Sequence, residues 1–131
     1  MLVRNLTVAV CFVLSACATA ADVAAPIPLS ASDEEMIKAG VRRRLRDPAS
    51  AQFEDIVVGR SPRGETFACG VVNAKNVMGG YAGRAPFYGV MSGGEFAVAS
   101  LGDADGGLIQ HGTIRALCKA HGVPLPERRF G

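Results

Sequence analysis

The sequence Cys69-Gly-Val-Val-Asn-Ala-Lys-Asn-Val-Met-Gly-Gly-Tyr-Ala-Gly-Arg-Ala-Pro-Phe-Tyr88 decides most of the fold. It begins with an apolar run, continues through a polar segment rich in glycine, and ends in an aromatic run. Short apolar runs bounded by glycine, proline and asparagine are typical of strands. This stretch therefore predicts two strands joined by a glycine-rich loop.

The neighbouring apolar runs extend these two strands into a small antiparallel sheet. Residues 53–60 lead into Ser61-Pro-Arg-Gly64, which is a good turn sequence. The run at residues 66–73 would pair back across this turn as the second strand of a hairpin. After the glycine-rich loop we expect two more strands, joined by a turn at Ser92-Gly-Gly94. These strands are residues 86–91 and residues 95–100.

An amphipathic helix is expected before the sheet, over residues 32–46. Ser32 is followed by three acidic residues, a sequence that is typical of a capping box at a helix N-terminus. Behind it, Ile37, Val41 and Leu45 recur at four-residue spacing, which places them on one side of a helix.

A second helix is expected after the sheet, over residues 108–120, with Gly122 as its terminator. Between the first helix and the sheet, Asp47-Pro48 would begin a short turn, with aspartate as its cap. Together these elements predict an α+β domain in which an N-terminal and a C-terminal helix flank about four strands. We expect one face of the sheet to be covered by helix and the other to be more open.

The N-terminus is typical of an exported protein. Arg4 precedes an apolar run that is too short to cross a bilayer as a helix. The run ends in Leu14-Ser-Ala-Cys17, which resembles the lipobox of bacterial lipoproteins, in which cleavage precedes a lipidated cysteine. The alternative is ordinary secretion, with cleavage after the small residues that end at Ala20.

These patterns predict three segments: a signal peptide over 1–16, a lipid-anchored tether over 17–31, and a single domain over 32–131. The tether is expected from a composition rich in alanine and proline. The residue after Cys17 is not the aspartate that usually retains bacterial lipoproteins at the inner membrane. We therefore expect a lipid-anchored protein of the bacterial cell envelope, on the periplasmic face of the outer membrane.

Two cysteines remain in the domain once the signal peptide and the lipidated Cys17 are set apart. These are Cys69 and Cys118, and in an oxidising compartment they are expected to form a disulfide bond. A reactive thiol is the alternative. The two domain cysteines and two histidines lack metal-ligand spacing, so we expect neither a metal nor a cofactor.

Charge excludes one class of partner. Loss of the signal removes only Arg4 from the 14 Lys and Arg, which stand against 12 Asp and Glu, so the mature chain is nearly neutral. Nucleic-acid binding needs a pronounced basic surface and is therefore not expected. The local basic run at 42–46 is either a solvated face or a contact for an anionic lipid or glycan. The acidic, glycine-containing run at 103–107 lacks the later ligands of a calcium loop and is interpreted as a surface turn.

Two segments resemble a family of small exported bacterial proteins of unknown function. One is Leu45-Arg-Asp-Pro-Ala-Ser-Ala-Gln-Phe53, and the other combines Cys69-Gly-Val-Val-Asn-Ala-Lys-Asn76 with Gly79-Gly-Tyr-Ala-Gly83. Family members share a Leu-Lys-Asp-Pro-x-Ser-Ala-x-Phe segment, in which Arg46 here replaces the lysine. The resemblance implies export and carries no known activity.

The glycine-rich loop holds the best cluster of polar side chains, and we interpret it as a candidate binding surface. Its glycines allow either a tight irregular loop or access of a ligand to backbone amides. The alternative is structural, with asparagines that cap the loop and a tyrosine that packs on the sheet. The candidate binding residues are Asn73, Lys75, Asn76, Tyr81, Arg84 and Tyr88.

The partners expected for such a surface are a periplasmic protein or peptidoglycan, and the alternative is a small inhibitor or immunity protein that acts on another periplasmic protein. An enzyme is less well supported, because no nucleophile has a base at a recognisable spacing. His111 and His121 are expected to project to different sides of the second helix, and Glu54 and Asp55 to opposite faces of a strand.

The first prediction concerns lipidation. Because Cys17 ends the sequence that resembles a lipobox, it is expected to be the first residue of the mature protein and to carry acyl chains. Two or more such chains would give stable membrane residence. Palmitate labelling together with inhibition of lipoprotein signal peptidase measures this, with Cys17→Ala as the unlabelled control. A soluble periplasmic protein that starts at Ala21 would contradict it.

Overall fold

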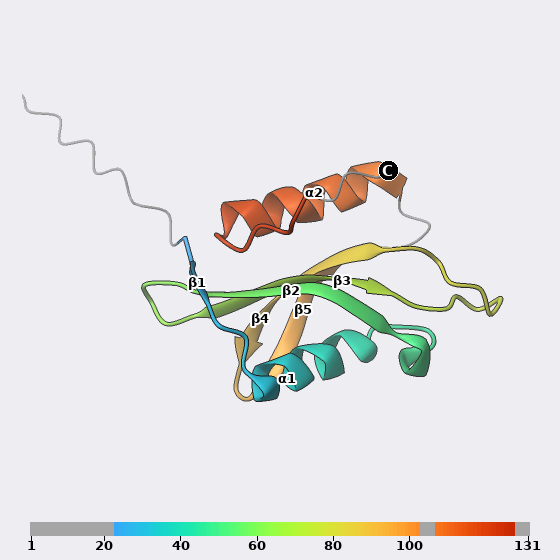
Figure 1. The fold of residues 1–131 in the computed structure, drawn as a ribbon, viewed down its shortest axis with the longest axis horizontal. Coiled ribbons are helices and arrows are strands. Elements are labelled where there is room, and N and C mark those ends of the chain that lie inside the picture. The colour runs from blue at the N-terminus through green and yellow to red at the C-terminus, as the bar shows by residue number, and fades with distance from the viewer. Residues whose placement is uncertain (1–22, 103–106, 128–131) are drawn as a thin grey trace, which may run out of the picture.

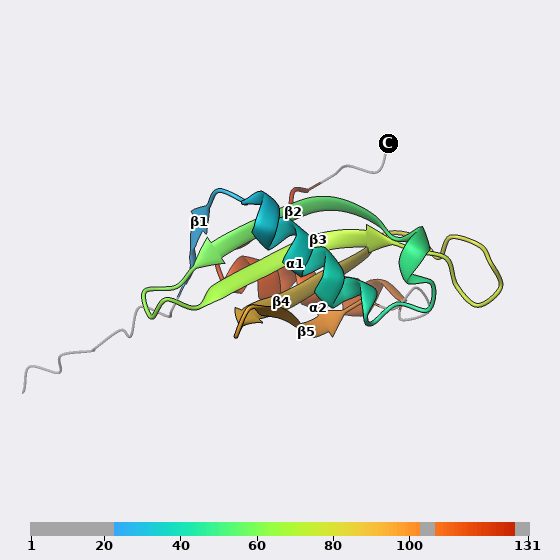
Figure 2. The same ribbon diagram turned by 90° about the horizontal axis from the view of Figure 1, so that it is seen from below.

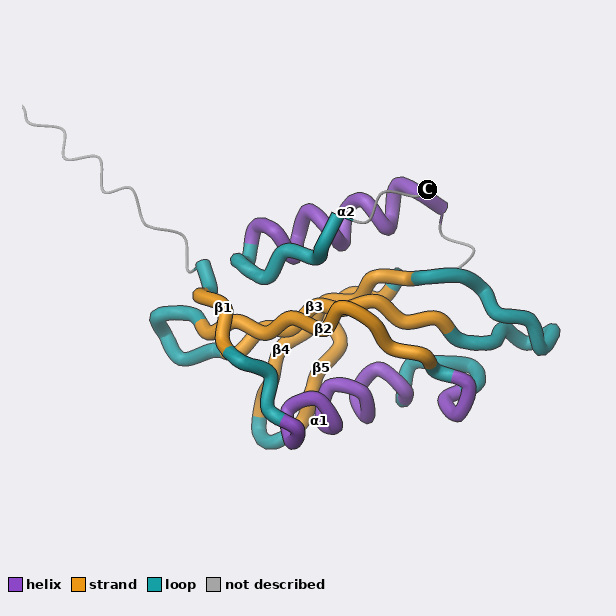
Figure 3. Tube along the Cα trace, in the orientation of Figure 1, coloured by secondary structure: helices purple, strands orange, loops and turns teal. Residues whose placement is uncertain are grey.

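The computed structural model describes residues 23–102 and 107–127, which form a sheet with one helix on each face (Figure 1). The five strands are antiparallel and lie in the order in which they occur along the chain. Figure 3 shows the turns and loops gathered at the two ends of the strands. The elements are β1 (Ala25–Ile27), α1 (Ala31–Arg42), the 3-10 helix η1 (Pro48–Ser50), β2 (Gln52–Arg60), β3 (Thr66–Asn73), β4 (Ala85–Ser92), β5 (Glu95–Leu101) and α2 (Gly107–Ala120).

The sheet has five strands, so the expectation of about four was wrong by one. The extra strand, β1, lies in the stretch that was expected to be a tether and pairs with the end of β2, where Ile27 is opposite Val58. Ala24 just before it is only 3% exposed. A three-residue edge strand with a central proline carries almost no sequence signal, because proline cannot donate to a ladder.

Both faces of the sheet are covered, which corrects the expectation that one would be more open. In β3, Phe67, Cys69 and Val71 belong to the core cluster under α2. The alternate residues Ala68 and Val72 belong to the cluster under α1. A strand that is buried on both faces reads as a continuous apolar run, and residues 67–72 form such a run, so the sequence did carry a signal for two covered faces.

The first helix was correctly expected, but its ends differ from those predicted. Ser30, and not Ser32, is the N-cap: its Oγ accepts a hydrogen bond from the backbone N–H of Asp33 at 3.1 Å. The helix ends at Arg42, four residues earlier than expected. Leu45 lies beyond this end and still packs against the core cluster, which is why it fits the apolar spacing.

The second helix ends as predicted, and its end touches the residue that precedes β1. Gly122 has a φ of 76°, a conformation that suits glycine after a helix. A side chain at this position would collide with the backbone of Ala24. The backbone N–H of Ala24 also donates to the carbonyl of His121 at 3.1 Å. Close approach therefore fixes β1 against the end of α2.

Each edge of the sheet is a strand with a distinct feature. On one side, β1 carries Pro26. On the other, arginines that follow α1 reach the backbone of β5: Arg43 donates to the carbonyl of Phe96 at 3.4 Å, and Arg44 donates to that of Val98 at 3.3 Å.

Among the described residues, no helix has the length and apolar character needed to cross a membrane.

The predicted disulfide bond is confirmed. Cys69 of the central strand β3 is bonded to Cys118 of α2, and both residues are fully buried. The bond closes a loop with a sequence separation of 49 residues. It therefore attaches the C-terminal helix covalently to the middle of the sheet.

Removing this bond is expected to destabilise the domain strongly. On the chain-entropy model a loop of this length contributes about 4 kcal/mol, which corresponds to a fall in melting temperature of roughly 15–30 °C for a domain of this size. Thermal unfolding of the protein before and after reduction measures the effect, and a Cys69→Ala, Cys118→Ala variant should be insensitive to reductant. Alkylation of both cysteines without prior reduction would show that the bond is absent in the isolated protein.

Candidate functional site

The segment that joins β3 to β4 protrudes beyond the end of the sheet (Figure 2). We call residues 74–84 the β3–β4 loop. It folds back on itself through an isolated bridge between Lys75 and Tyr81. Backbone hydrogen bonds close its tip, from Asn76 N–H to the Gly80 carbonyl at 2.8 Å and from Gly79 N–H to the Asn76 carbonyl at 3.0 Å. The loop is thus a small ordered hairpin extension.

Two of the predicted binding residues support the loop itself. The Asn76 side-chain oxygen accepts from the N–H groups of Met78 at 2.9 Å and Gly80 at 3.3 Å. The Asn73 side-chain oxygen accepts from Gly83 N–H at 3.0 Å. Asparagine side chains often hold turns in this way. Both asparagines therefore cap the backbone of the loop, as the structural alternative to a binding role expects.

The loop is anchored to η1 by one serine that sequence reasoning did not single out. Ser50 Oγ accepts from the Lys75 backbone N–H at 2.8 Å, and the Ser50 carbonyl accepts from the Tyr81 hydroxyl at 3.2 Å. Ser50 is held in turn by Asp47, whose side chain accepts from Ser50 N–H at 3.3 Å. The segment around η1 and the β3–β4 loop therefore contact each other through Ser50.

Lys75 and Tyr81 are brought together on the surface of the loop. The Lys75 ammonium lies 5.7 Å from the centre of the Tyr81 ring, within cation–π range. Tyr81 is 46% exposed and donates its hydroxyl to Ser50. The hydroxyl end of Tyr81 is thereby held in place, while the rest of the side chain remains partly accessible.

Arg84 faces carboxylates rather than a vacant surface. Its Nη2 lies 2.7 Å from Glu54 and 3.4 Å from Asp55, on β2. The two carboxylates were expected on opposite faces of a strand, but the pairing of β2 is irregular after Glu54, and Asp55 has a φ of 52°. This local departure from extended backbone lets both reach one arginine.

Tyr88 does not belong to the loop surface, contrary to the sequence interpretation. It is only 6% exposed and lies in the core under α2. Its ring lies 6.1 Å from Phe67 and 5.0 Å from His121, measured between ring centres. Burial, together with the charge of Glu65, raises the pKa of its hydroxyl. The reason is register: Tyr88 is opposite Cys69, on the face that α2 covers.

The tip of the loop exposes apolar side chains that sequence reasoning missed. Met78 is 88% exposed and Val77 is 75% exposed. With Tyr81 and Val23 they make up the large apolar residues that are exposed in the described part of the chain. The signal in the sequence is a pair of adjacent apolar residues inside a glycine-rich loop.

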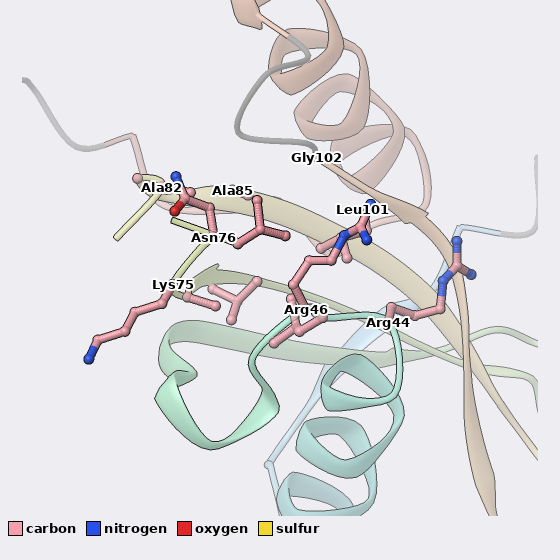
Figure 4. Close-up of a pocket in the computed structure, with 13 residues that line it drawn as sticks. Arg44, Arg46, Lys75, Asn76, Ala82, Ala85, Leu101 and Gly102 are labelled. Atoms are coloured by element: carbon pink, nitrogen blue, oxygen red, sulfur yellow. The ribbon is translucent and has the colours of Figure 1, made fainter. Parts of the chain in front are cut away.

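A pocket of about 410 Å³ lies at the base of the loop, between the β3–β4 loop and the segment that follows α1 (Figure 4). Three of the side chains that line it are cationic, namely Arg44, Arg46 and Lys75. Its apolar part is formed by residues such as Val72 and Leu101. Within residues 23–102 and 107–127, no cluster of His, Cys, Asp or Glu is arranged to hold a metal ion.

The arrangement of the loop predicts a specific role for Asn76. Its replacement by alanine should leave two backbone N–H groups without their acceptor and speed the hydrogen exchange of the Met78 and Gly80 amides. Asn76→Asp keeps the accepting oxygen and is the matched control. The structural role would be wrong if exchange at both amides were the same in Asn76→Ala as in the unmodified protein.

Comparisons with protein-family models, with characterised proteins and with solved structures found no match to this chain.

Proposed function

We propose that this protein is a lipid-anchored binding module of the bacterial envelope, which holds another envelope protein through the tip of its β3–β4 loop. The observation that carries the proposal is the exposure of Val77 and Met78 at the end of an ordered, protruding loop. Apolar side chains on a rigid projection can enter a groove of a partner without a large loss of conformational entropy. No catalytic step is needed for this role.

The polar details of the loop favour a protein partner over a glycan. Stacking on a sugar or peptide would use Tyr81 and Tyr88, and donation to a carboxylate or phosphate would use Lys75 and Arg84. Tyr88 is buried, and Arg84 is engaged with Glu54. What remains exposed at the tip is chiefly apolar, which suits the desolvated centre of a protein interface.

Preorganisation supports the same conclusion. The tip is closed by Asn76 and the base is anchored through Ser50. Binding therefore does not have to order the loop, and the affinity is not reduced by that cost. The same geometry fits an inhibitor or immunity protein that inserts the loop into a partner's cleft, and the identity of the captured partner separates the two roles.

Site-specific crosslinking in intact cells tests the proposal. A photoreactive amino acid in place of Val77 should give one discrete protein adduct, whereas the same amino acid in place of Pro62, at the opposite end of the sheet, should not. Adding Met78→Asp should lower the yield at least tenfold, because a charge would be buried in an apolar interface. Ser92→Asp, at the exposed end of β4 far from the loop, is the matched control.

An absent adduct, or an adduct whose yield is unaffected by Met78→Asp, would overturn the proposal. If the protein is retained on purified peptidoglycan, and if Met78→Asp does not reduce this retention, the result would instead point to a wall-binding role. If the adduct contains an enzyme whose activity falls on binding, the module acts as an inhibitor.

A further inference from the structure

The basic run that follows α1 has a place in the structure that the proposed function does not use. Arg44 and Arg46 lie on the segment between α1 and η1 and line the pocket at the base of the β3–β4 loop. Figure 4 shows the Arg46 side chain extending toward Leu101, while the Lys75 ammonium points away from it. Arg46 is therefore the cation that lies most directly against the pocket.

The electrostatics of the pocket favour an anion. The described lining residues include no carboxylate, and of the three cations among them Arg46 is the one whose side chain extends over the pocket in Figure 4. Arg46 makes no hydrogen bond or ion pair with the described part of the chain, and the guanidinium of Arg44 has a backbone carbonyl, that of Val98, as its partner. Guanidinium groups bind carboxylate and phosphate through paired hydrogen bonds, and each such contact is stronger than a neutral one.

The floor of the pocket favours an apolar body on the same ligand. The core residues Val72 and Ala85 line the pocket, together with Leu45 and Leu101. A bare inorganic anion would leave this apolar wall without a partner. The volume of about 410 Å³ lies within the range of roughly 300–1,000 Å³ that is typical of small-molecule pockets.

We infer that this pocket binds a small amphipathic anion, with a carboxylate or phosphate head group at Arg46 and an apolar chain on the wall formed by Val72, Ala85 and Leu101. The inference is independent of the protein partner proposed for the loop tip. Fatty acids and single-chain phospholipids both have this chemistry. Tighter binding of a carboxylate head group would indicate a fatty acid as the ligand, and tighter binding of a phosphate would indicate a single-chain phospholipid.

Titrations followed by amide NMR test the inference. The sample is the mature chain, residues 17–131 with Cys17→Ser, so that neither a lipid anchor nor detergent competes. The probes are decanoate, decyl phosphate, decanol and inorganic phosphate, all kept below micelle-forming concentrations. Decanoate or decyl phosphate should shift the amides of Ala82, Gly83 and Gly102, and decanol should bind at least tenfold more weakly.

Two arginine variants locate the head group. Arg46→Gln should weaken binding of the tighter anion by about tenfold to a hundredfold, the usual loss when a charged hydrogen bond is removed. Arg60→Gln removes one exposed arginine at the opposite end of the sheet and should leave the affinity unchanged. Met78→Asp should also retain binding, so a failure at the pocket is distinguishable from a failure at the loop tip.

Three results would overturn the inference. Equal binding of decanol and decanoate would show that the head group is not recognised. Shifts of the same amides by inorganic phosphate with equal affinity would show that the apolar wall contributes nothing. Unchanged affinity of Arg46→Gln for the tighter anion, or no saturable shift with any amphipathic probe, would show that the pocket does not bind such an anion.

Discussion

The burial of β3 on both faces is the constraint on which the other elements depend. One set of its side chains packs under α2 and the alternate set packs under α1. A sheet whose middle strand is apolar on both sides is stable only when both faces are covered, because exposed apolar area costs about 25 cal/mol per Å². The disulfide bond then holds one of the two covers to this strand. β3 also leads directly into the β3–β4 loop, so the same strand supports the candidate site.

Much of the fold could be predicted from local sequence. The strand Thr66–Asn73 was predicted with its observed bounds, and the disulfide between Cys69 and Cys118 followed from compartment and cysteine number. The missing strand, β1, could not be found in this way, because three residues with a proline become a strand only through pairing with β2 and contact with α2. The second covered face was predictable, because residues 67–72 lack the polar alternation of a strand with one exposed face.

The candidate site was predictable in place but not in composition. Glycines and asparagines between two strands correctly indicated an ordered loop, and Lys75 and Tyr81 do meet on its surface. Tyr88 was misplaced because its face depends on register with Cys69, which sequence does not fix. The pocket was beyond sequence reasoning, since Arg46 and Leu101 are 55 positions apart and meet only through the packing of α1 against β5.

The hydrogen bonds from Arg43 and Arg44 to β5 bear on how copies of this protein meet one another. The outer edge of a sheet is a template for a strand from another molecule, and charged side chains or proline on that edge prevent such pairing. Here arginines occupy two carbonyls of β5, and Pro26 lacks the N–H that β1 would need. On the proposed lipid anchor, copies would be crowded into a single plane, where collisions between edges are frequent. The arginines hydrogen-bonded to β5 and the proline on β1 would oppose the pairing of these edges with a strand of another copy.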